Sequence, residues 1–212
     1  MSKQRGTFIS LEGGEGAGKS TLLAGLRDYI AAQGVDLVLT REPGGTALGE
    51  AVRAIVLDPA RHGMAAETEL LLMFASRAQL VRELIEPALT AGQWVLCDRF
   101  TDASFAYQGG GRGQPVERIA ELERWATDGL SPDMTLLLDL PVATGRARAA
   151  GRGEADRIEV EADVFFERVR EAYRARAAAE PKRFQIIDAS LTPVEVLHAA
   201  IAAIAPLFEV KA

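Results

Sequence analysis

Gly13-Gly14-Glu15-Gly16-Ala17-Gly18-Lys19-Ser20 is the segment of this chain from which its fold class can be inferred. It fits the G-x-x-x-x-G-K-[S/T] phosphate loop, and it lies between an apolar run at 7–11 and a helical pattern. Glycines let the backbone curl so that successive N–H groups point at phosphate oxygens, and the following helix directs the positive end of its dipole at the same charge. We therefore predict a nucleoside-triphosphate site in which Lys19 reaches the β- and γ-phosphates and Ser20 ligates Mg²⁺.

Two other interpretations of these glycines are weaker. A Rossmann dinucleotide site needs G-x-G-x-x-G, which glycines at 13, 14, 16 and 18 do not provide, and it has no use for Lys19. A glycine-rich turn with an accidental lysine is disfavoured because Leu22, Leu23 and Leu26 follow at helical spacing. The residues expected to bind ATP are Gly13, Gly14, Glu15, Gly16, Ala17, Gly18, Lys19, Ser20 and Thr21.

Length and composition narrow the class of protein. The chain has 212 residues, of which 48% are apolar, so we expect one core and a single domain over 1–212. A net charge of −6 disfavours a broad surface for nucleic acid. The single cysteine excludes an internal disulfide, and no N-terminal stretch is apolar enough for a signal peptide or a membrane span. We expect a cytoplasmic protein without nucleic-acid or membrane partners.

Short apolar runs alternate with longer helical patterns along the whole chain. The sequence predicts strands near 7–12, 36–40, 94–98, 134–139 and 184–188. It predicts helices near 19–33, 46–57, 67–91, 115–127, 141–150, 161–179 and 192–207. Such alternation indicates βαβ units and a parallel sheet.

Two glycine-rich breaks carry an arginine. Gly109-Gly110-Gly111-Arg112-Gly113 and Gly151-Arg152-Gly153 combine backbone freedom with a forked cation, which is typical of loops that close over phosphate. A plain surface loop is the alternative for each of them.

A phosphate loop needs a second carboxylate for its metal, usually an aspartate at the end of a buried strand. Asp98 has that position after 94–97, as do Asp139 and Asp188 after their own apolar runs. Only Asp98 is followed at once by an arginine, Arg99, and then by a polar run suited to a second substrate. We therefore expect Ser20 and Asp98 to hold Mg²⁺.

The chain resembles bacterial thymidylate kinases over nearly its whole length. Besides the phosphate loop, the resemblance is carried by 40–46 (Thr-Arg-Glu-Pro-Gly-Gly-Thr), by 98–109 (Asp-Arg-Phe…Ala-Tyr-Gln-Gly) and by 152–159 (Arg-Gly-Glu-Ala-Asp-Arg-Ile-Glu). It implies the three-layer αβα fold of P-loop NTPases, with a five-stranded parallel sheet flanked by helices and a small lid at about 145–158. It also implies a homodimer.

The same resemblance implies roles for individual positions. Glu15 would face the 3′-hydroxyl of the deoxyribose, while Arg99 and Arg77 would hold the phosphate and the edge of the base. The other residues that it assigns to the dTMP site are Glu42, Pro43, Arg53, Ser104, Tyr107 and Gln108. The last three of these would contact the thymidine part, with Tyr107 crowding the 2′ position.

This sequence departs from the family pattern at two places. A thymine-stacking phenylalanine usually lies four residues before the arginine matched to Arg77, but here Met73 stands there with Phe74 beside it. Either could cover the base, and either could pack in the core. The second departure is Gly16, where some members carry an arginine, so the lid is expected to supply the catalytic cation.

Arg152 matches the place of the lid arginine, with Arg148 and Arg157 as alternatives. The expected catalytic residues are Lys19, Arg152, Arg99 and Glu15.

The implied reaction moves a phosphoryl group from ATP to dTMP, giving dTDP and ADP. Such a transfer needs positioning and neutralisation of charge and no covalent enzyme intermediate. Another nucleoside monophosphate kinase is the nearer alternative. A GTPase-type switch would read guanine with an Asn-Lys-x-Asp segment, and this chain has no asparagine.

Overall fold

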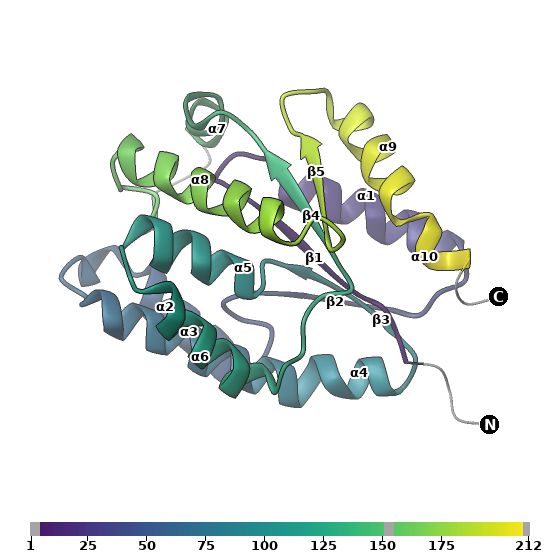
Figure 1. The fold of residues 1–212 in the computed structure, drawn as a ribbon, viewed down its shortest axis with the longest axis horizontal. Coiled ribbons are helices and arrows are strands. Elements are labelled where there is room, and N and C mark those ends of the chain that lie inside the picture. Colours follow the sequence, from purple (N-terminus) through teal and green to yellow (C-terminus); the bar gives the residue numbers. More distant parts are fainter. Residues whose placement is uncertain (1–4, 151–154, 210–212) are drawn as a thin grey trace.

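The structure, a computed structural model, describes residues 5–150 and 155–209 (Figure 1). Its centre is a five-stranded parallel sheet with the strand order β2-β3-β1-β4-β5. The strands are β1 (Phe8–Gly13), β2 (Leu37–Arg41), β3 (Trp94–Asp98), β4 (Met134–Asp139) and β5 (Phe184–Asp188). The α/β fold with a five-stranded parallel sheet is confirmed, and each strand begins and ends within one residue of its predicted bounds.

The central strands are apolar on both faces because helices cover both sides of the sheet. Ile9 and Leu11 of β1 pack with Leu136 and Leu138 of β4 in one core cluster. Phe8, which alternates with them along β1, belongs to a second cluster on the opposite face. This arrangement explains the continuous apolar runs in the sequence.

Helices form the two outer layers (Figure 1). On one face, α1 (Lys19–Ala32) packs against α9 (Pro193–Ile204), which α10 (Pro206–Glu209) follows. The helices associated with the other face are α3 (Ala66–Leu80), α4 (Glu86–Thr90), α5 (Thr101–Ser104) and α8 (Asp163–Ala179). Against these pack α2 (Ala47–Leu57), α6 (Val116–Thr127) and α7 (Val142–Ala149).

Two predicted segments differ in detail. The helix expected over 67–91 is interrupted between α3 and α4 by a π-helical stretch, η2 (Val81–Ile85), and a short 3₁₀ turn, η1 (Pro59–Arg61), precedes α3. The glycine-rich break near 109 is not a loop at its start, because the π-helix η3 (Phe105–Gly111) continues through it. A Cβ at Gly110 would lie 2.7 Å from the Arg168 carbonyl oxygen, and one at Gly111 would lie 2.4 Å from the Phe165 ring. These glycines therefore allow η3 to pack closely on α8.

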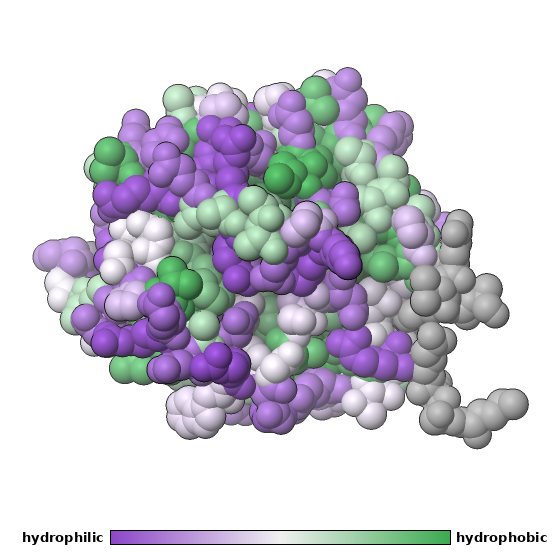
Figure 2. All heavy atoms as spheres, in the orientation of Figure 1, coloured by the Kyte–Doolittle hydropathy of each residue, from purple (hydrophilic) through white to green (hydrophobic). Residues whose placement is uncertain are grey.

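The outer surface is mainly polar on the face seen in Figure 2, with smaller apolar patches between hydrophilic side chains. Within 5–150 and 155–209, no helix combines the length and the apolar character that crossing a bilayer requires.

The single cysteine lies inside the sheet. Cys97 of β3 is fully buried, and its thiol donates to the Arg99 carbonyl oxygen at 2.9 Å. Burial raises the pKa of this thiol well above its usual value. Cys97 is therefore a packing residue held in the un-ionised form.

Candidate active site

The phosphate loop connects β1 to α1 with the geometry that its glycines predict. Gly13, Gly16 and Gly18 have φ values of 141°, 70° and 91°, which side chains rarely adopt. Lys19 is buried and donates from Nζ to the carbonyl oxygens of Gly13 and Gly14, both at 3.0 Å. Burial, and then the charge of Arg99, lower the pKa of Lys19. The ammonium group of Lys19 thus lies beside the loop backbone, where a bound phosphate would need a positive charge.

Gly16 has a second reason to be glycine. A Cβ at this position would lie 2.0 Å from the carbonyl oxygen of Gly145 in α7. Because φ is also positive, this loop has no room for an arginine at position 16. The departure noted in the sequence is therefore a packing requirement between the loop and α7.

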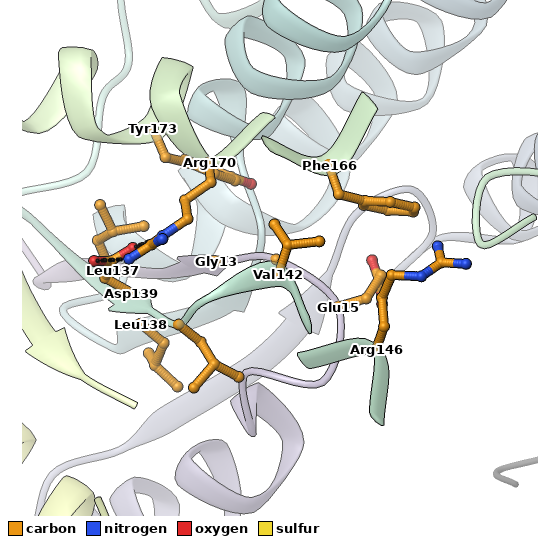
Figure 3. Close-up of a pocket in the computed structure, with 12 residues that line it drawn as sticks. Gly13, Glu15, Leu137, Leu138, Asp139, Val142, Arg146, Phe166, Arg170 and Tyr173 are labelled. Carbon is orange, nitrogen blue, oxygen red and sulfur yellow. Dashed lines mark hydrogen bonds and ion pairs between the residues drawn. The ribbon is translucent and has the colours of Figure 1, made fainter. Parts of the chain in front are cut away.

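One cleft of about 650 Å³ brings most of the expected site together. The predicted residues that line it are Glu15, Gly16, Ala17, Gly18, Lys19, Ser20, Thr21, Glu42, Pro43, Arg53, Met73, Asp98, Arg99, Tyr107 and Gln108. Gly13 and Gly14 line a different cavity behind the loop, of about 20 Å³, between β4, α7 and α8 (Figure 3). A second hollow of about 250 Å³ on the other side of the loop is formed by 16–18, Thr21, Arg148 and residues of 189–196.

Arg99 joins the phosphate loop to the wall of the cleft. Its guanidinium donates to the Gly13 carbonyl oxygen at 3.0 Å, to Glu15 Oε1 at 2.7 Å and to Tyr173 Oη at 3.2 Å. Tyr107 also donates to Glu15 Oε1, at 3.0 Å, and Arg99 lies over its ring. Arg99 has a φ of 69°, an uncommon value outside glycine that often marks functional sites. The backbone at the end of β3 is therefore set to point this side chain into the cleft.

Four cations line the cleft together with five carboxylates, and the cations lie close enough to one another to interact. Burial, and next the charge of Arg41, lower the pKa of Arg53, with Arg99 adding to the effect. Arg53 donates to the Pro43 carbonyl oxygen at 3.1 Å. Arg41, Arg53, Arg99 and Lys19 all line the same hollow. Cations that repel one another in a concave site favour a bound anion.

Asp98 and Ser20 line the same cleft, as a shared metal requires. Asp98 Oδ1 is buried and has no hydrogen-bond partner among the described residues. The rival aspartates are engaged elsewhere: Asp139 pairs with Arg170 at 2.7 and 3.0 Å, as Figure 3 shows, and Asp188 accepts from the Ser190 N–H.

The described ranges contain no cluster of three or more His, Cys, Asp or Glu side chains suited to a metal ion. Mg²⁺ in phosphate-transfer sites commonly uses one or two protein oxygens and the phosphates of the substrate. The donor set of Ser20 and Asp98 therefore fits Mg²⁺ bound together with a nucleotide.

The structure separates Met73 from Phe74. Met73 lines the cleft, whereas Phe74 packs with Leu70 and Phe105 in a core cluster. The rotation of about 100° per helical residue sends the two side chains of α3 in different directions. Met73 is therefore the side chain available to a base in the cleft.

Arg77 and Ser104 lie behind the cleft wall rather than on it. Arg77 is fully buried and donates to Glu42 Oε2 at 2.8 Å from Nε and 2.5 Å from Nη2. It also donates to Ser104 Oγ at 3.0 Å and lies over the Phe74 ring. In this arrangement Arg77 positions Glu42, and its predicted contact with the nucleotide stays a prediction.

The lid is described only in part. Arg152 lies outside the described residues. Arg148 donates to the carbonyl oxygens of Ala189 and Ser190 beside the second hollow. Arg157 is buried and donates to the Val56 carbonyl oxygen at 2.7 Å and to Glu69 at 2.6 Å. In this conformation, neither alternative lid arginine is among the residues that line the main cleft.

Arg112, the arginine of the other glycine-rich break, is paired with carboxylates. It donates to Glu69 at 3.3 Å and to Glu161, and it lies over the Phe165 ring. In this structure the guanidinium of Arg112 binds carboxylates, so these contacts do not support the prediction that this segment closes over phosphate.

Sequence reasoning missed three residues of the site region. Arg41 lines the cleft and is paired in register with Asp98. It belongs to the quoted 40–46 segment, so a signal was present. Glu12 is fully buried and accepts from the Phe100 N–H and the Tyr173 hydroxyl, both at 2.7 Å. Glu69 is the third of these residues. The local sequence around Glu12 and around Glu69 has no pattern that would reveal their partners.

A parallel sheet whose central strand leads into a phosphate loop, beside a cleft lined by cations, defines a P-loop nucleotide-binding protein. Comparison with known proteins narrows this class. The thymidylate kinase family profile matches residues 11–201, and the chain belongs to the thymidylate kinase family.

Individual relatives agree with this assignment. The thymidylate kinase of Alkalilimnicola ehrlichii is 58% identical, over 93% of this chain and 91% of the relative. That of Pseudomonas putida strain W619 is 58% identical over 94% and 96%, and that of Pseudomonas entomophila is 56% identical over 95% of each.

Proposed function

We propose that this chain transfers the γ-phosphoryl group of ATP to dTMP, giving ADP and dTDP. The observation that carries the proposal is the single cleft that joins the phosphate loop to Arg99, Met73, Tyr107 and Gln108. A donor phosphate on the loop and an acceptor phosphate beside Arg99 would lie in the same cleft. The family assignment supports thymine as the base.

The residues have separable tasks in this proposal. Lys19 and the loop amides bind the donor phosphates, and Arg99 and Arg53 bind the acceptor phosphate. Glu15, which accepts hydrogen bonds from Arg99 and Tyr107, also accepts one from the 3′-hydroxyl of the nucleotide. Neutralising the two anions and aligning them supplies most of the rate.

Ser20 and Asp98 would hold Mg²⁺, which supplies positive charge on the transferring phosphates when bound. The second hollow, beside Arg148 and Pro193, is the proposed place for the adenine of ATP. Arg152 is proposed as the lid cation, because Gly16 cannot be replaced by a larger residue. We further propose a homodimer in the cytoplasm, on the strength of the resemblance.

The test is a steady-state assay of ADP formation with dTMP, dGMP, dCMP and dAMP as separate acceptors. The highest kcat/KM is expected for dTMP. A higher kcat/KM for guanylate or cytidylate would reassign the chain to another monophosphate specificity.

A further inference from the structure

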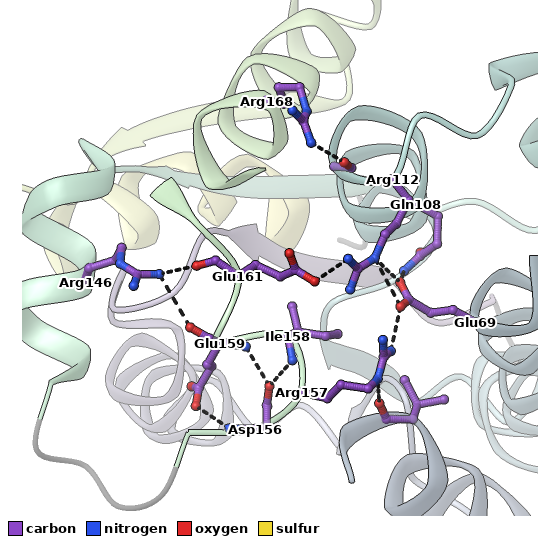
Figure 4. A network of polar contacts seen from close by, with 12 residues as sticks. Glu69, Gln108, Arg112, Arg146, Asp156, Arg157, Ile158, Glu159, Glu161 and Arg168 are labelled. Atoms are coloured by element: carbon purple, nitrogen blue, oxygen red, sulfur yellow. Dashed lines mark hydrogen bonds and ion pairs between the residues drawn. The ribbon is translucent and has the colours of Figure 1, made fainter. Parts of the chain in front are cut away.

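A buried carboxylate behind the cleft wall accepts hydrogen bonds from three side chains (Figure 4). Glu69 of α3 is 1% exposed, and it accepts from Gln108 Nε2 at 2.8 Å, from Arg157 Nη2 at 2.6 Å and from Arg112 Nε at 3.3 Å. Burial opposes its ionisation, but the hydrogen bonds of Gln108 and Arg157 and the charges of Arg112 and Arg157 lower its pKa. Glu69 is therefore ionised, and an ionised carboxylate only accepts hydrogen bonds.

This acceptor fixes the orientation of the Gln108 amide. The oxygen and nitrogen of a glutamine amide are distinguished by their partners, and a carboxylate can be faced only by the nitrogen. Gln108 lines the cleft, and its Oε1 is buried without a hydrogen-bond partner among the described residues. A buried carbonyl without a donor is unfavourable, so a ligand that donates to it is favoured. Gln108 thus keeps one unused acceptor and one remaining N–H.

We propose that Glu69 is a positioning residue that makes the site select thymine over cytosine by fixing the amide of Gln108. The proposal rests on the proposed function. Thymine presents an N3–H donor beside a 4-oxo acceptor, whereas cytosine presents an N3 acceptor beside a 4-amino donor. With Nε2 held by Glu69, Oε1 accepts from the thymine N3–H, and the same Oε1 opposes the cytosine N3 lone pair. An amide turned by 180° would favour cytosine instead.

The two arginines explain why this orientation is stable. Arg157 also donates to the Val56 carbonyl oxygen, and Arg112 also pairs with Glu161, so both cations are anchored away from Gln108. They keep Glu69 charged and in place. Base selection is thereby set by a residue that does not contact the nucleotide.

The test compares kcat/KM for dTMP with kcat/KM for dCMP in the wild type, in Glu69→Gln and in the control Arg112→Met. Glutamine at position 69 can donate or accept, so it no longer fixes the Gln108 amide. We expect the dTMP/dCMP ratio to fall at least about tenfold in Glu69→Gln, the equivalent of one hydrogen bond, mainly through KM. Arg112→Met removes the longer ion pair of Glu69, but Arg157 still holds the carboxylate at 2.6 Å and the bond to Gln108 remains, so its ratio should match the wild type.

The double variant Glu69→Gln/Gln108→Glu covers the case in which Glu69→Gln does not fold. In it, the amide at 69 donates to a carboxylate at 108, which again presents only acceptors, so selectivity against dCMP should return. Three results would overturn the proposal: an unchanged ratio in folded Glu69→Gln, an equal loss in Arg112→Met, or no selectivity in the double variant. A wild type that does not prefer dTMP would instead contradict the proposed function, so the wild-type ratio is measured first.

Discussion

Asp98 and Asp139 are two aspartates at strand ends with different surroundings, and they give a direct test of the metal site. Asp98 Oδ1 has no partner in the described part of the chain, whereas Asp139 is paired with Arg170. Asp98→Asn should raise the Mg²⁺ concentration needed for half-maximal activity by about tenfold or more, because a charged ligand is lost. Asp139→Asn should leave that concentration within about twofold. The reverse order in a magnesium titration of activity would place the metal on β4.

Glu12 should make stability depend on pH in an unusual direction. Burial, and then the charge of Asp102, raise its pKa from 4.5 to about 8. Since the folded state binds the proton more tightly than the unfolded state, this stabilisation is complete below about pH 4.5 and is lost as pH rises through about 8. Each pH unit within this window removes at most about 1.4 kcal/mol.

Glu12→Gln should abolish that slope. The difference in free energy of unfolding between the variant and the wild type should therefore shift in favour of the variant as pH rises from 5 to 8. Urea denaturation at several pH values measures it. Glu171→Gln, at an exposed glutamate of α8, is the control and should keep the wild-type slope. Parallel pH profiles for the wild type and Glu12→Gln would contradict the prediction.

At the scale of elements, the contact between α7 and the phosphate loop leaves no space. A Cβ at Gly145 would lie 2.3 Å from the Glu15 carbonyl oxygen. Gly145→Ala should cost about 1–3 kcal/mol of stability and lower kcat/KM, because the loop and the Glu15–Arg99 pair must shift. Gly63→Ala meets no atom within 4 Å and should be close to neutral. Equal melting temperatures for the two variants would mean that the contact relaxes freely.

The lid arginines can be separated by alanine substitution. Arg152→Ala should lower kcat by about 10³-fold or more if it acts as an arginine finger, with little change in dTMP affinity. Arg157→Ala should act differently, mainly by lowering stability, because its guanidinium is bound to Glu69 and Val56. Single-turnover rates and melting temperatures distinguish the two. A kcat loss below about threefold in Arg152→Ala, beside a large loss in Arg148→Ala or Arg157→Ala, would reassign the role.

Elements and contiguous motifs were predictable from the sequence because their signals are local. The strands are apolar runs, and the phosphate loop is one uninterrupted segment. The buried carboxylates were not predictable, since Glu12 and Tyr173 are 161 positions apart and Glu69 and Arg157 are 88 positions apart. The helical conformation of 105–111 was not predicted, because its glycines are needed for close packing against α8, which lies far along the chain.

At the scale of the whole molecule, the proposed homodimer can be tested on the surface of α3 and α6, which pack against each other. Trp125 of α6 is 83% exposed, and Leu71 of α3 is 56% exposed. Burying such side chains in a second copy would stabilise association. Light scattering should give the mass of two chains, and Trp125→Glu should shift the protein toward one chain. Val164→Glu, at another exposed apolar residue, on α8, should not. A wild-type mass of one chain would contradict the dimer.

The burial of Cys97 makes the reactivity of its thiol a measure of local unfolding. Because the only thiol of the chain lies within β3 and stays protonated, alkylating reagents can reach it only when the sheet opens. The rate of labelling then measures the opening of the central strands, without any engineered probe. Nucleotides that bind the cleft at the end of β3 should slow this labelling in proportion to their affinity. Ligand binding to the purified protein can thus be measured from the labelling rate of a native thiol in the core.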